Sequence, residues 1–384
     1  MTACLFGTYV RSHSANRLLR LALAGAGWDV VECHEPLWEE TPTKEAPYFG
    51  AASLARLGAR FAAAARRLAR RWRTFARGGA PPLVVVGFGG QLDVLLARRV
   101  CRPRAGLVFA PLVSLTETLV EDRRRVAAGG VAARALAALD RTTLRAADLV
   151  LADTAAHAAY LARLGAPADR VAVWHLGAEP EFLAPIAPAP VPRRVLFYGS
   201  HLPLHGVETI VDAAARLGAR ADVHVIGDGP ARAAVEARAR AAGAAVAFRD
   251  PVPLAALPAE LARAAVVLGV FGEGAKAAMV VPNKVWQAAA AGRPLVTRDG
   301  PGLREVLEPG RHCLACPPGD PAALADAVAR LLDDPALAAR LGAAARARVL
   351  ERFGPARQAA ALATLLAAGV AAAPAAAAVR PSAA

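Results

Sequence analysis

The sequence contains very little lysine. Only Lys44, Lys276 and Lys284 occur in 384 residues, so arginine carries almost all of the positive charge behind the net value of +14. Arginine preference combined with abundant alanine is typical of a GC-rich coding bias, so part of this basicity need not serve a function. A basic surface nevertheless favours anionic partners such as nucleotides, acidic lipid headgroups or nucleic acid.

Aromatic residues are also scarce, at 5% of the chain. No motif that reads RNA or DNA occurs, and the arginines are spread along every helical pattern instead of gathering in one basic segment. A nucleic-acid binder would show aromatic residues interleaved with a basic stripe. Nucleic acid is therefore not expected as a partner, although a basic nucleic-acid-binding protein stays open as an alternative from a different class.

Disulfides, metal motifs and membrane spans have little support in the sequence. Five cysteines, an odd number without a secretory start, favour a reducing cytoplasm. Cys313 and Cys316 form a C-x-x-C without the second pair that a zinc site needs, so we interpret them as buried thiols. No run is long and apolar enough to span a bilayer. No Asp-x-Asp occurs either, which argues against a metal–diphosphate site, and we expect no bound metal.

Short apolar runs alternate with long alanine- and arginine-rich helical patterns, which is typical of βαβ units and parallel sheets. The expected strands lie at 3–7, 29–33, 82–88, 106–110, 149–153, 171–176, 194–199, 221–227, 245–250, 265–270 and 294–299. The pattern predicts an α/β chain with two tandem Rossmann-like domains. They would comprise residues 1–184, a Pro-rich linker at 185–192, residues 193–354, a helix at 355–369 that crosses back to the first domain, and a disordered tail at 370–384.

Open α/β sheets bind ligands where the carboxyl ends of their strands meet helix N-termini. On the side of the second domain the candidate residues in such loops are Gly199, Ser200, His201, Gly227 and Gly229. On the side of the first domain they are Gly7, Thr8, Tyr9, Asn16, Arg17, Phe88 and Gly89. Glycine lets backbone N–H groups approach an anion closely, but each of these motifs is weak alone, because glycine is common in any strand-to-helix turn.

Three segments of the second half resemble one known family. "RRVLFYGSHLPLHG", "VIGDGP" and "NKVWQAAAAGRPLVT" are similar to the donor-domain loops and small-residue helix of GT-B glycosyltransferases of the retaining family 4 type. The resemblance implies two domains facing across a cleft. It also implies hexosyl transfer from a nucleotide sugar to a lipid-linked or glycan acceptor, with retention, without metal, and with no cofactor beyond the nucleotide-sugar co-substrate. The loop residues of the first domain would then bind the acceptor, and those of the second would bind the donor.

The sequence departs from the family at the charged positions. An arginine and a lysine that usually face the donor diphosphate are replaced by Ser200 and His205, and a ribose-binding glutamate by Gln287. Glu273 lies upstream in a longer loop than the family has. Since a diphosphate leaving group needs positive charge, we expect compensation from other residues. The candidate catalytic residues are His205, Lys284 and Glu273, with Lys276, Asn283 and Gln287 added to the donor site.

The local pattern around Lys284 predicts a helix N-terminus in the donor site. Pro282 cannot continue a preceding helix and Asn283 is a favoured N-cap, so a helix should begin at Lys284 and end at Gly292. A cation at a helix start is unfavourable unless an anion comes to meet it.

The arginine-rich segment at 51–79 leaves two interpretations open. Its apolar residues, among them Leu68 and Trp72, fall near one side, so it is either an ordinary domain helix with a solvated arginine face or a helix that lies on anionic lipid. The second interpretation would make the protein peripheral on the inner face of the cell membrane, in a role in cell-envelope glycan synthesis. Among enzymes, a sugar-nucleotide epimerase of the same fold is the alternative. A dehydrogenase is disfavoured because no full G-x-G-x-x-G follows a strand.

Overall fold

The computed structural model describes residues 1–39, 51–101, 105–184 and 190–371, and these contain two β-sheets in which every pairing is parallel. Strand order is β2-β1-β3-β4-β5-β6 in the first sheet and β12-β11-β10-β7-β8-β9 in the second. The first sheet contains β1 Thr2–Gly7, β2 Asp29–His34, β3 Leu83–Val86, β4 Gly106–Phe109, β5 Leu149–Ala152 and β6 Val171–Val173. The second contains β7 Arg194–Tyr198, β8 Asp222–Ile226, β9 Val246–Arg249, β10 Val266–Leu268, β11 Leu295–Arg298 and β12 Leu314–Cys316. The predicted fold class is confirmed.

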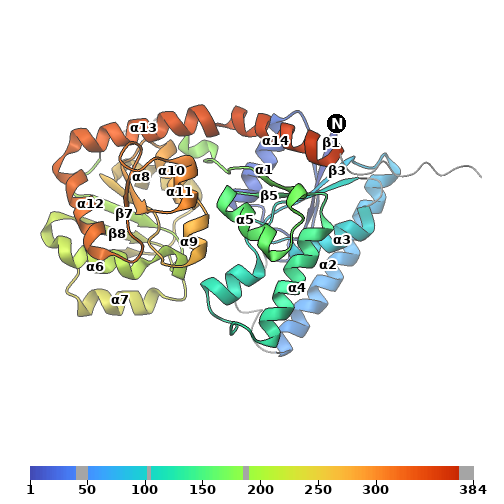
Figure 1. Ribbon diagram of the computed structural model, residues 1–384, viewed down its shortest axis with the longest axis horizontal. Coiled ribbons are helices and arrows are strands. Elements are labelled where there is room, and N and C mark those ends of the chain that lie inside the picture. The colour runs from blue at the N-terminus through green and yellow to red at the C-terminus, as the bar shows by residue number, and fades with distance from the viewer. Residues whose placement is uncertain (40–50, 102–104, 185–189, 372–384) are drawn as a thin grey trace, which may run out of the picture.

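Helices cover both faces of each sheet (Figure 1). Those of the first half are α1 Ser14–Gly25, α2 Ala51–Arg77, α3 Gln91–Cys101, the π-helix η2 Thr116–Asp122, α4 Val131–Ala146, α5 Ala155–Leu164, and the single turns η3 Ala168–Arg170 and η4 Pro180–Phe182. Those of the second are η5 Pro203–His205, α6 Val207–Leu217, η6 Gly218–Arg220, α7 Arg232–Ala241, η7 Leu254–Ala256, α8 Leu257–Arg263, α9 Ala275–Met279, α10 Asn283–Ala290, α11 Pro301–Val306, α12 Pro321–Asp333, α13 Pro335–Phe353 and α14 Pro355–Ala371.

The central strands are buried on both sides, as strands of all-parallel sheets are when helices cover both faces, whereas the edge strands β2, β6 and β9 are partly exposed. Every residue of β3, β5 and β7 is buried, and helices such as α6 contribute an apolar stripe at helical spacing, including Ile210, Ala214 and Leu217. The hydrophobic periodicity that predicted the elements is therefore the same periodicity that forms the two cores.

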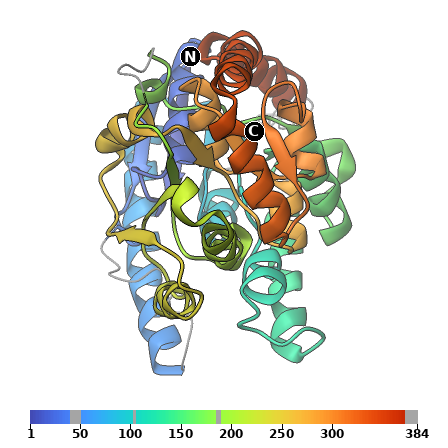
Figure 2. The ribbon, with the colours of Figure 1, turned by 90° about the vertical axis from the view of Figure 1, so that its left-hand side faces the viewer.

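The chain returns to the first domain at its carboxyl end. After α13 it breaks at Gly354, and α14 packs on α1, where Leu362 and Leu366 join the core of the first domain and the Trp174 indole N–H donates to the Gln358 carbonyl at 3.2 Å. Figures 1 and 2 show α13 and α14 in red along the top of the molecule. The helix extends to Ala371, so residues 370 and 371, placed in the tail by the sequence, are helical. Residues 372–384 and most of the Pro-rich linker, 185–189, lie outside the described residues.

One strand was missed from the sequence. β12 is only three residues long and ends in Cys316, so no alternation or apolar run revealed it.

The five cysteines are buried and unbridged, and burial raises the pKa of the Cys313 and Cys316 thiols to about 12. The interpretation of the C-x-x-C as two buried thiols is confirmed.

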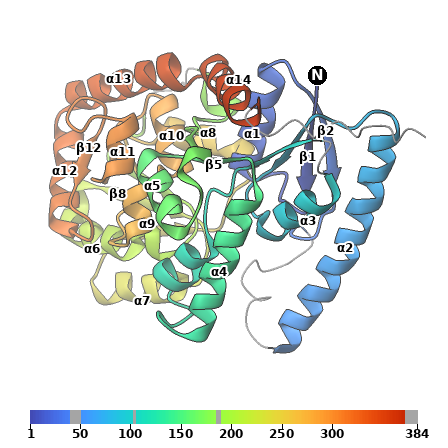
Figure 3. The same ribbon diagram turned by 45° about the vertical axis from the view of Figure 1, so that its right-hand side comes forward.

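Helix α2 lies along the outer edge of the first domain (Figure 3). Its apolar residues Leu68 and Trp72 are buried in the core of that domain, and Arg67 pairs with the buried Glu35 at 2.6 Å. Leu68 and Trp72 on the apolar side of this part of the helix are thus used for packing, whereas its arginines and Phe75 are exposed.

Candidate active site

The glycine loops of the second domain pack on one another at the carboxyl edge of its sheet. A Cβ at Gly227 would lie 2.0 Å from the Gly199 carbonyl oxygen, and a Cβ at Gly229 would lie 2.6 Å from the His201 nitrogen. Both glycines also have positive φ angles, 145° and 155°. These glycines are required for close approach of the two loops, so their sequence pattern reflects loop packing before it reflects ligand contact.

Lys284 lies beneath the first of these loops, in the first turn of α10. Its ammonium nitrogen is 4.2 Å from the centre of the Phe197 ring and 2.8 Å from the point where a Gly199 Cβ would stand. The side chain is 5% exposed and its Nζ has no hydrogen-bond partner among the described residues. Burial lowers the pKa of Lys284 well below its ordinary value. A buried donor with no hydrogen-bond partner is rare in proteins and needs an explanation.

His205, in the loop that follows β7, lies close to Lys284 of α10. Its Nδ1 contacts the Ser200 carbonyl oxygen, so Nδ1 carries the proton and donates. Its Cε1 is 3.6 Å from the point where a Gly199 Cβ would stand, which is also the point close to Lys284 Nζ. Burial and the Lys284 charge lower the pKa of His205 well below its ordinary value. The structure therefore brings together His205, Lys284, Gly199 and Ser200 of the predicted donor site.

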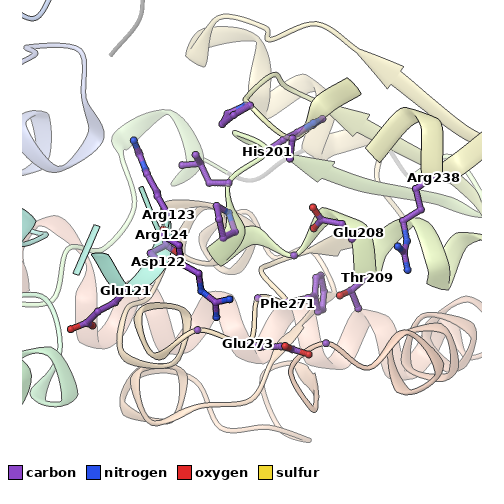
Figure 4. Close-up of a pocket in the computed structure, with 18 of the residues that line it drawn as sticks. Glu121, Asp122, Arg123, Arg124, His201, Glu208, Thr209, Arg238, Phe271 and Glu273 are labelled. Carbon is purple, nitrogen blue, oxygen red and sulfur yellow. The ribbon is translucent and has the colours of Figure 1, made fainter. Parts of the chain in front are cut away.

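A cavity of about 730 Å³ lies next to this cluster, between the two domains (Figure 4). From the second domain it is lined by His201, the start of α6 including Gly206 and Glu208, and Glu273. Neither Lys284 nor His205 lines it, although His201, Pro203 and Gly206 of the same loop as His205 do. His201 is fully buried, and neither of its ring nitrogens has a hydrogen-bond partner within the described ranges. Burial lowers the pKa of His201, which favours a neutral ring.

The opposite wall of the cavity comes from the first domain. Residues 121–125, at the end of the π-helix and directly after it, line the cavity, and Arg123, Arg124 and Arg125 supply three consecutive positive charges. Asp122 accepts a hydrogen bond from the backbone N–H of Leu204, in the loop after β7, and this bond joins the two walls. Sequence reasoning missed these residues because no strand or glycine turn precedes them directly, although the Arg-Arg-Arg triplet itself was visible.

Lys276 was expected in the donor site, and the structure uses it elsewhere. Its Nζ donates to the Thr118 hydroxyl at 3.0 Å and lies 3.9 Å from the Glu117 carboxylate, both in the first domain. Lys276 and Glu117 are buried, at 7% and 0% exposure. This lysine therefore holds α9 against η2 across the cleft, and its role in the donor site stays a prediction that these contacts do not support.

Gln287 is also engaged inside the protein. Its amide nitrogen donates to Glu179 at 2.9 Å, and its amide oxygen accepts from the Tyr198 hydroxyl at 2.9 Å. All three residues are buried. An amide with both ends occupied has little left for a ribose, so the ribose-binding role expected for Gln287 is not supported by its contacts.

Two further residues differ in detail. Asn283 is the first residue of α10 and Pro282 occupies the N-cap position without a side-chain cap bond, so Asn283 does not cap the helix as expected. The helix ends as expected near Gly292, whose φ is 70°. Glu273 is exposed in the cavity wall and not in contact with Lys284.

The loop residues predicted for the acceptor side of the first domain are mostly tied to one another. Thr8 donates from its backbone and its hydroxyl to Asp93 Oδ2, at 2.8 and 2.9 Å. Asn16 donates to the Val10 carbonyl and accepts from the Phe88 backbone, both within 2.9 Å. Since these polar groups are satisfied internally, Thr8 and Asn16 position the loops and are not acceptor contacts in this conformation.

Most of the remaining residues predicted for the acceptor side also contact other parts of the protein. Tyr9 is buried against His34, and Arg17 pairs with Glu181 of the segment that leads to the second domain. Gly7 has its Cβ position only 2.6 Å from an Asp93 oxygen, which excludes any side chain. Phe88 stacks on His13 with 4.0 Å between ring centres, and Gly89 alone faces open space, with a φ of 87°.

Within the described ranges, no helix is long and apolar enough to cross a membrane, and no group of three or more histidine, cysteine and acidic residues is arranged to hold a metal ion.

The fold defines a class. Two six-stranded parallel sheets facing across a cavity match the GT-B glycosyltransferase architecture. HepE of Anabaena, solved in complex with UDP and glucose, superposes with a TM-score of 0.71 at 14% identity, covering 96% of this chain and 99% of that one. Sucrose-phosphate synthase of Thermosynechococcus elongatus gives 0.71 at 20% identity, with 95% and 97% covered.

Sequence comparison then points to a family for the second domain. Residues 192–334 match the family described as Glycosyl transferases group 1, so the chain carries a glycosyltransferase family domain. Alpha-D-kanosaminyltransferase of Streptomyces kanamyceticus is 32% identical over 158 residues, 38% of each protein. Glycogen synthase of Mycobacterium tuberculosis is 49% identical over 67 residues, 17% of this chain and 16% of that enzyme. Each match thus spans well under half of the relative.

Proposed function

We propose that this protein transfers a sugar from a nucleotide-activated donor to a lipid-linked or glycan acceptor in the cleft between its domains, with retention and without a metal ion. The family match covers the donor-binding domain, and HepE, a protein of the same fold, was solved with UDP bound. The nucleotide would bind the second domain at the loops after β7 and β8.

The observation that carries the proposal is the unpartnered Lys284 ammonium. Burying a charged donor without a partner costs free energy that an anion would recover. The diphosphate of a nucleotide sugar supplies such an anion, and the N-terminus of α10 offers its unpaired N–H groups in the same place. Because Lys284 is 5% exposed, binding requires the loop that begins at Ser200 to move aside.

The Lys284 ammonium and a protonated His205 ring would stabilise the leaving diphosphate. As the sugar–phosphate bond breaks, negative charge grows on the diphosphate, and preorganised positive charge lowers the barrier to that step. A bound phosphate would raise the pKa of both groups again, so the cations needed for departure form when the donor arrives. Retention follows when the acceptor hydroxyl attacks from the face that the diphosphate leaves.

The proposed position on the inner membrane face rests on α2. Arg66, Arg70, Arg73 and Arg77 are exposed on this helix. Since Leu68 and Trp72 are buried, attraction to lipid would be electrostatic and would fade with salt. Such a surface would bring the protein to a lipid-linked acceptor.

The test is calorimetric binding of UDP, GDP, ADP and TDP, followed by incubation of the matching nucleotide sugars with and without EDTA. We expect one nucleoside diphosphate to bind and EDTA to leave transfer unchanged. Absence of binding by every nucleotide would refute the proposal. Conversion of the nucleotide sugar into its epimer without an acceptor would instead favour the epimerase, for which Glu208 and Glu273 would be the acid–base candidates in the cavity wall.

A further inference from the structure

We infer that the cavity between the domains is the acceptor subsite and that it selects an acceptor bearing a phosphate group, held by Arg124 and its two arginine neighbours. The inference rests on the proposed function, and it narrows the acceptor from any glycan to a phosphorylated sugar or a lipid-linked sugar phosphate.

The backbone of the arginine segment is fixed in a way that presents Arg124 to the cavity. Arg123 and Arg125 donate backbone hydrogen bonds to the Thr118 and Leu119 carbonyls at 3.0 and 2.8 Å. Between them Arg124 adopts a φ of 49°, a left-handed conformation that is unfavourable for a residue other than glycine. Arg124 is exposed and forms no ion pair with any described residue.

The second wall adds groups that also favour an oxyanion. The N-terminus of α6 opens at Gly206, which gives no side-chain cap to the first N–H groups of this helix. His201 lines the same cavity, fully buried, with two ring nitrogens that have no partner in the described part of the chain. A phosphate oxygen would satisfy the ring N–H and the helix N–H groups together.

The carboxylates of the cavity set the orientation of the ligand. Glu121 accepts from the Tyr160 hydroxyl at 3.0 Å, Asp122 accepts from Leu204, and Asp212 pairs with Arg238 at 2.6 Å. Glu208 and Glu273 have no such partner among the described residues. Carboxylates repel phosphate and accept hydrogen bonds from hydroxyl groups, so the phosphate belongs between Arg124 and His201, and the sugar hydroxyls belong beside Glu208 and Glu273.

Neither Lys284 nor His205 lines the cavity, so the two sites can be probed with different ligands and different variants. With UDP, or whichever nucleotide binds, at saturation, calorimetry would compare the affinity for glucose 6-phosphate with that for glucose. Sedimentation would compare the amount of protein bound to phosphatidylcholine vesicles with and without polyprenyl phosphate. The two arms distinguish a soluble sugar phosphate from a lipid phosphate. We expect one of them to bind and its affinity to fall about tenfold in Arg124→Gln, the loss of one charge-assisted hydrogen bond, and further in Arg124→Glu.

Arg134→Gln is the matched control, since Arg134 is an exposed arginine of the same domain, on α4, that does not line the cavity. Nucleotide affinity should be the same in Arg124→Gln and the unmodified protein. Binding of neither phosphate probe, or equal binding by both Arg124 variants, would overturn the inference while leaving the donor site intact. A loss of nucleotide affinity in Arg124→Gln would also overturn it, because the arginines would then serve the donor.

Discussion

Replacement of Lys284 by methionine should change stability and affinity in opposite directions. Methionine keeps most of the length of the buried stem and removes the ammonium, which is 5% exposed and has no hydrogen-bond partner in the described residues. Leaving a buried donor unsatisfied costs about 1–3 kcal/mol, and the Phe197 ring at 4.2 Å returns about 0.5–2 kcal/mol through a cation–π contact. The variant should therefore be more stable than the unmodified protein by about 1 kcal/mol.

Nucleotide affinity should fall in the same variant. A hydrogen bond to a charged group contributes about 1.5–3 kcal/mol, so the dissociation constant of the nucleoside diphosphate should rise roughly 10- to 100-fold. Lys284→Ala should lose a similar amount of nucleotide affinity, and it would also leave a cavity where the buried stem of the side chain was. Arg240→Met removes an exposed charge from α7 of the same domain and should leave both quantities unchanged.

The stability difference should depend on pH. Burial lowers the pKa of Lys284 well below 10.5, so the unfolded chain binds a proton that the folded chain lacks between these two values. Stability of the unmodified protein should consequently rise with pH in this window, and the advantage of the methionine variant should shrink. Chemical denaturation at several pH values, with calorimetry of the nucleotide, measures both effects. A variant with unchanged nucleotide affinity would refute the reasoning.

The remaining predictions concern other parts of the molecule. His205→Ala should lower turnover strongly while changing the free energy of unfolding little. Activity equal to that of the unmodified protein at several pH values would exclude His205 from the mechanism. Burial raises the pKa of Asp93 from 3.8 to about 6, so its stabilising contribution is present below about pH 4 and lost as pH rises to 6. In denaturation experiments, the free energy of unfolding of Asp93→Asn relative to that of the unmodified protein should therefore increase by about 3 kcal/mol between pH 4 and 7.5. No increase would contradict this. In flotation experiments the protein should bind anionic liposomes through residues 66–77 at low salt and release them at high salt. No lipid binding at either salt would exclude residues 66–77 as a lipid-binding surface. Lys276→Met should enlarge the radius of gyration in X-ray scattering, because the contact with Thr118 across the cleft is lost; an unchanged radius would show that other contacts suffice.

The strands and the α10 helix were predictable because local signals determine them. Apolar runs of a few residues bounded by glycine located every strand of both sheets except β12, and Pro282 with Gly292 marked the two ends of α10. Such signals act within a few residues of one another. Their failure at β12 has the same cause, since a strand of three residues offers no period to detect.

The partners of polar side chains were not predictable, because they come from distant parts of the chain. Gln287 is tied to Glu179, 108 residues away, and Lys276 to Thr118, 158 residues away. A family position assigned Gln287 to the ligand and the need for positive charge assigned Lys276, but nothing in the sequence showed that these protein partners would reach them. The same limit explains why Arg124 was overlooked, since its role depends on a wall from the other domain.

The scarcity of lysine acquires a physical meaning from the two lysines that the structure describes. Lys276 closes the cleft by contacting Thr118 and Glu117, where its charge has partners. Lys284 is buried with no hydrogen-bond partner among the described residues. This position suits lysine better than arginine, because an ammonium can lose its proton when buried whereas a guanidinium stays charged. An arginine at 284 would keep its charge in the empty site and bear the cost of desolvation throughout, whereas a lysine whose pKa is lowered by burial can take up a proton when the proposed nucleotide arrives. This difference gives a physical reason for a lysine at 284 in a chain that uses arginine almost everywhere else.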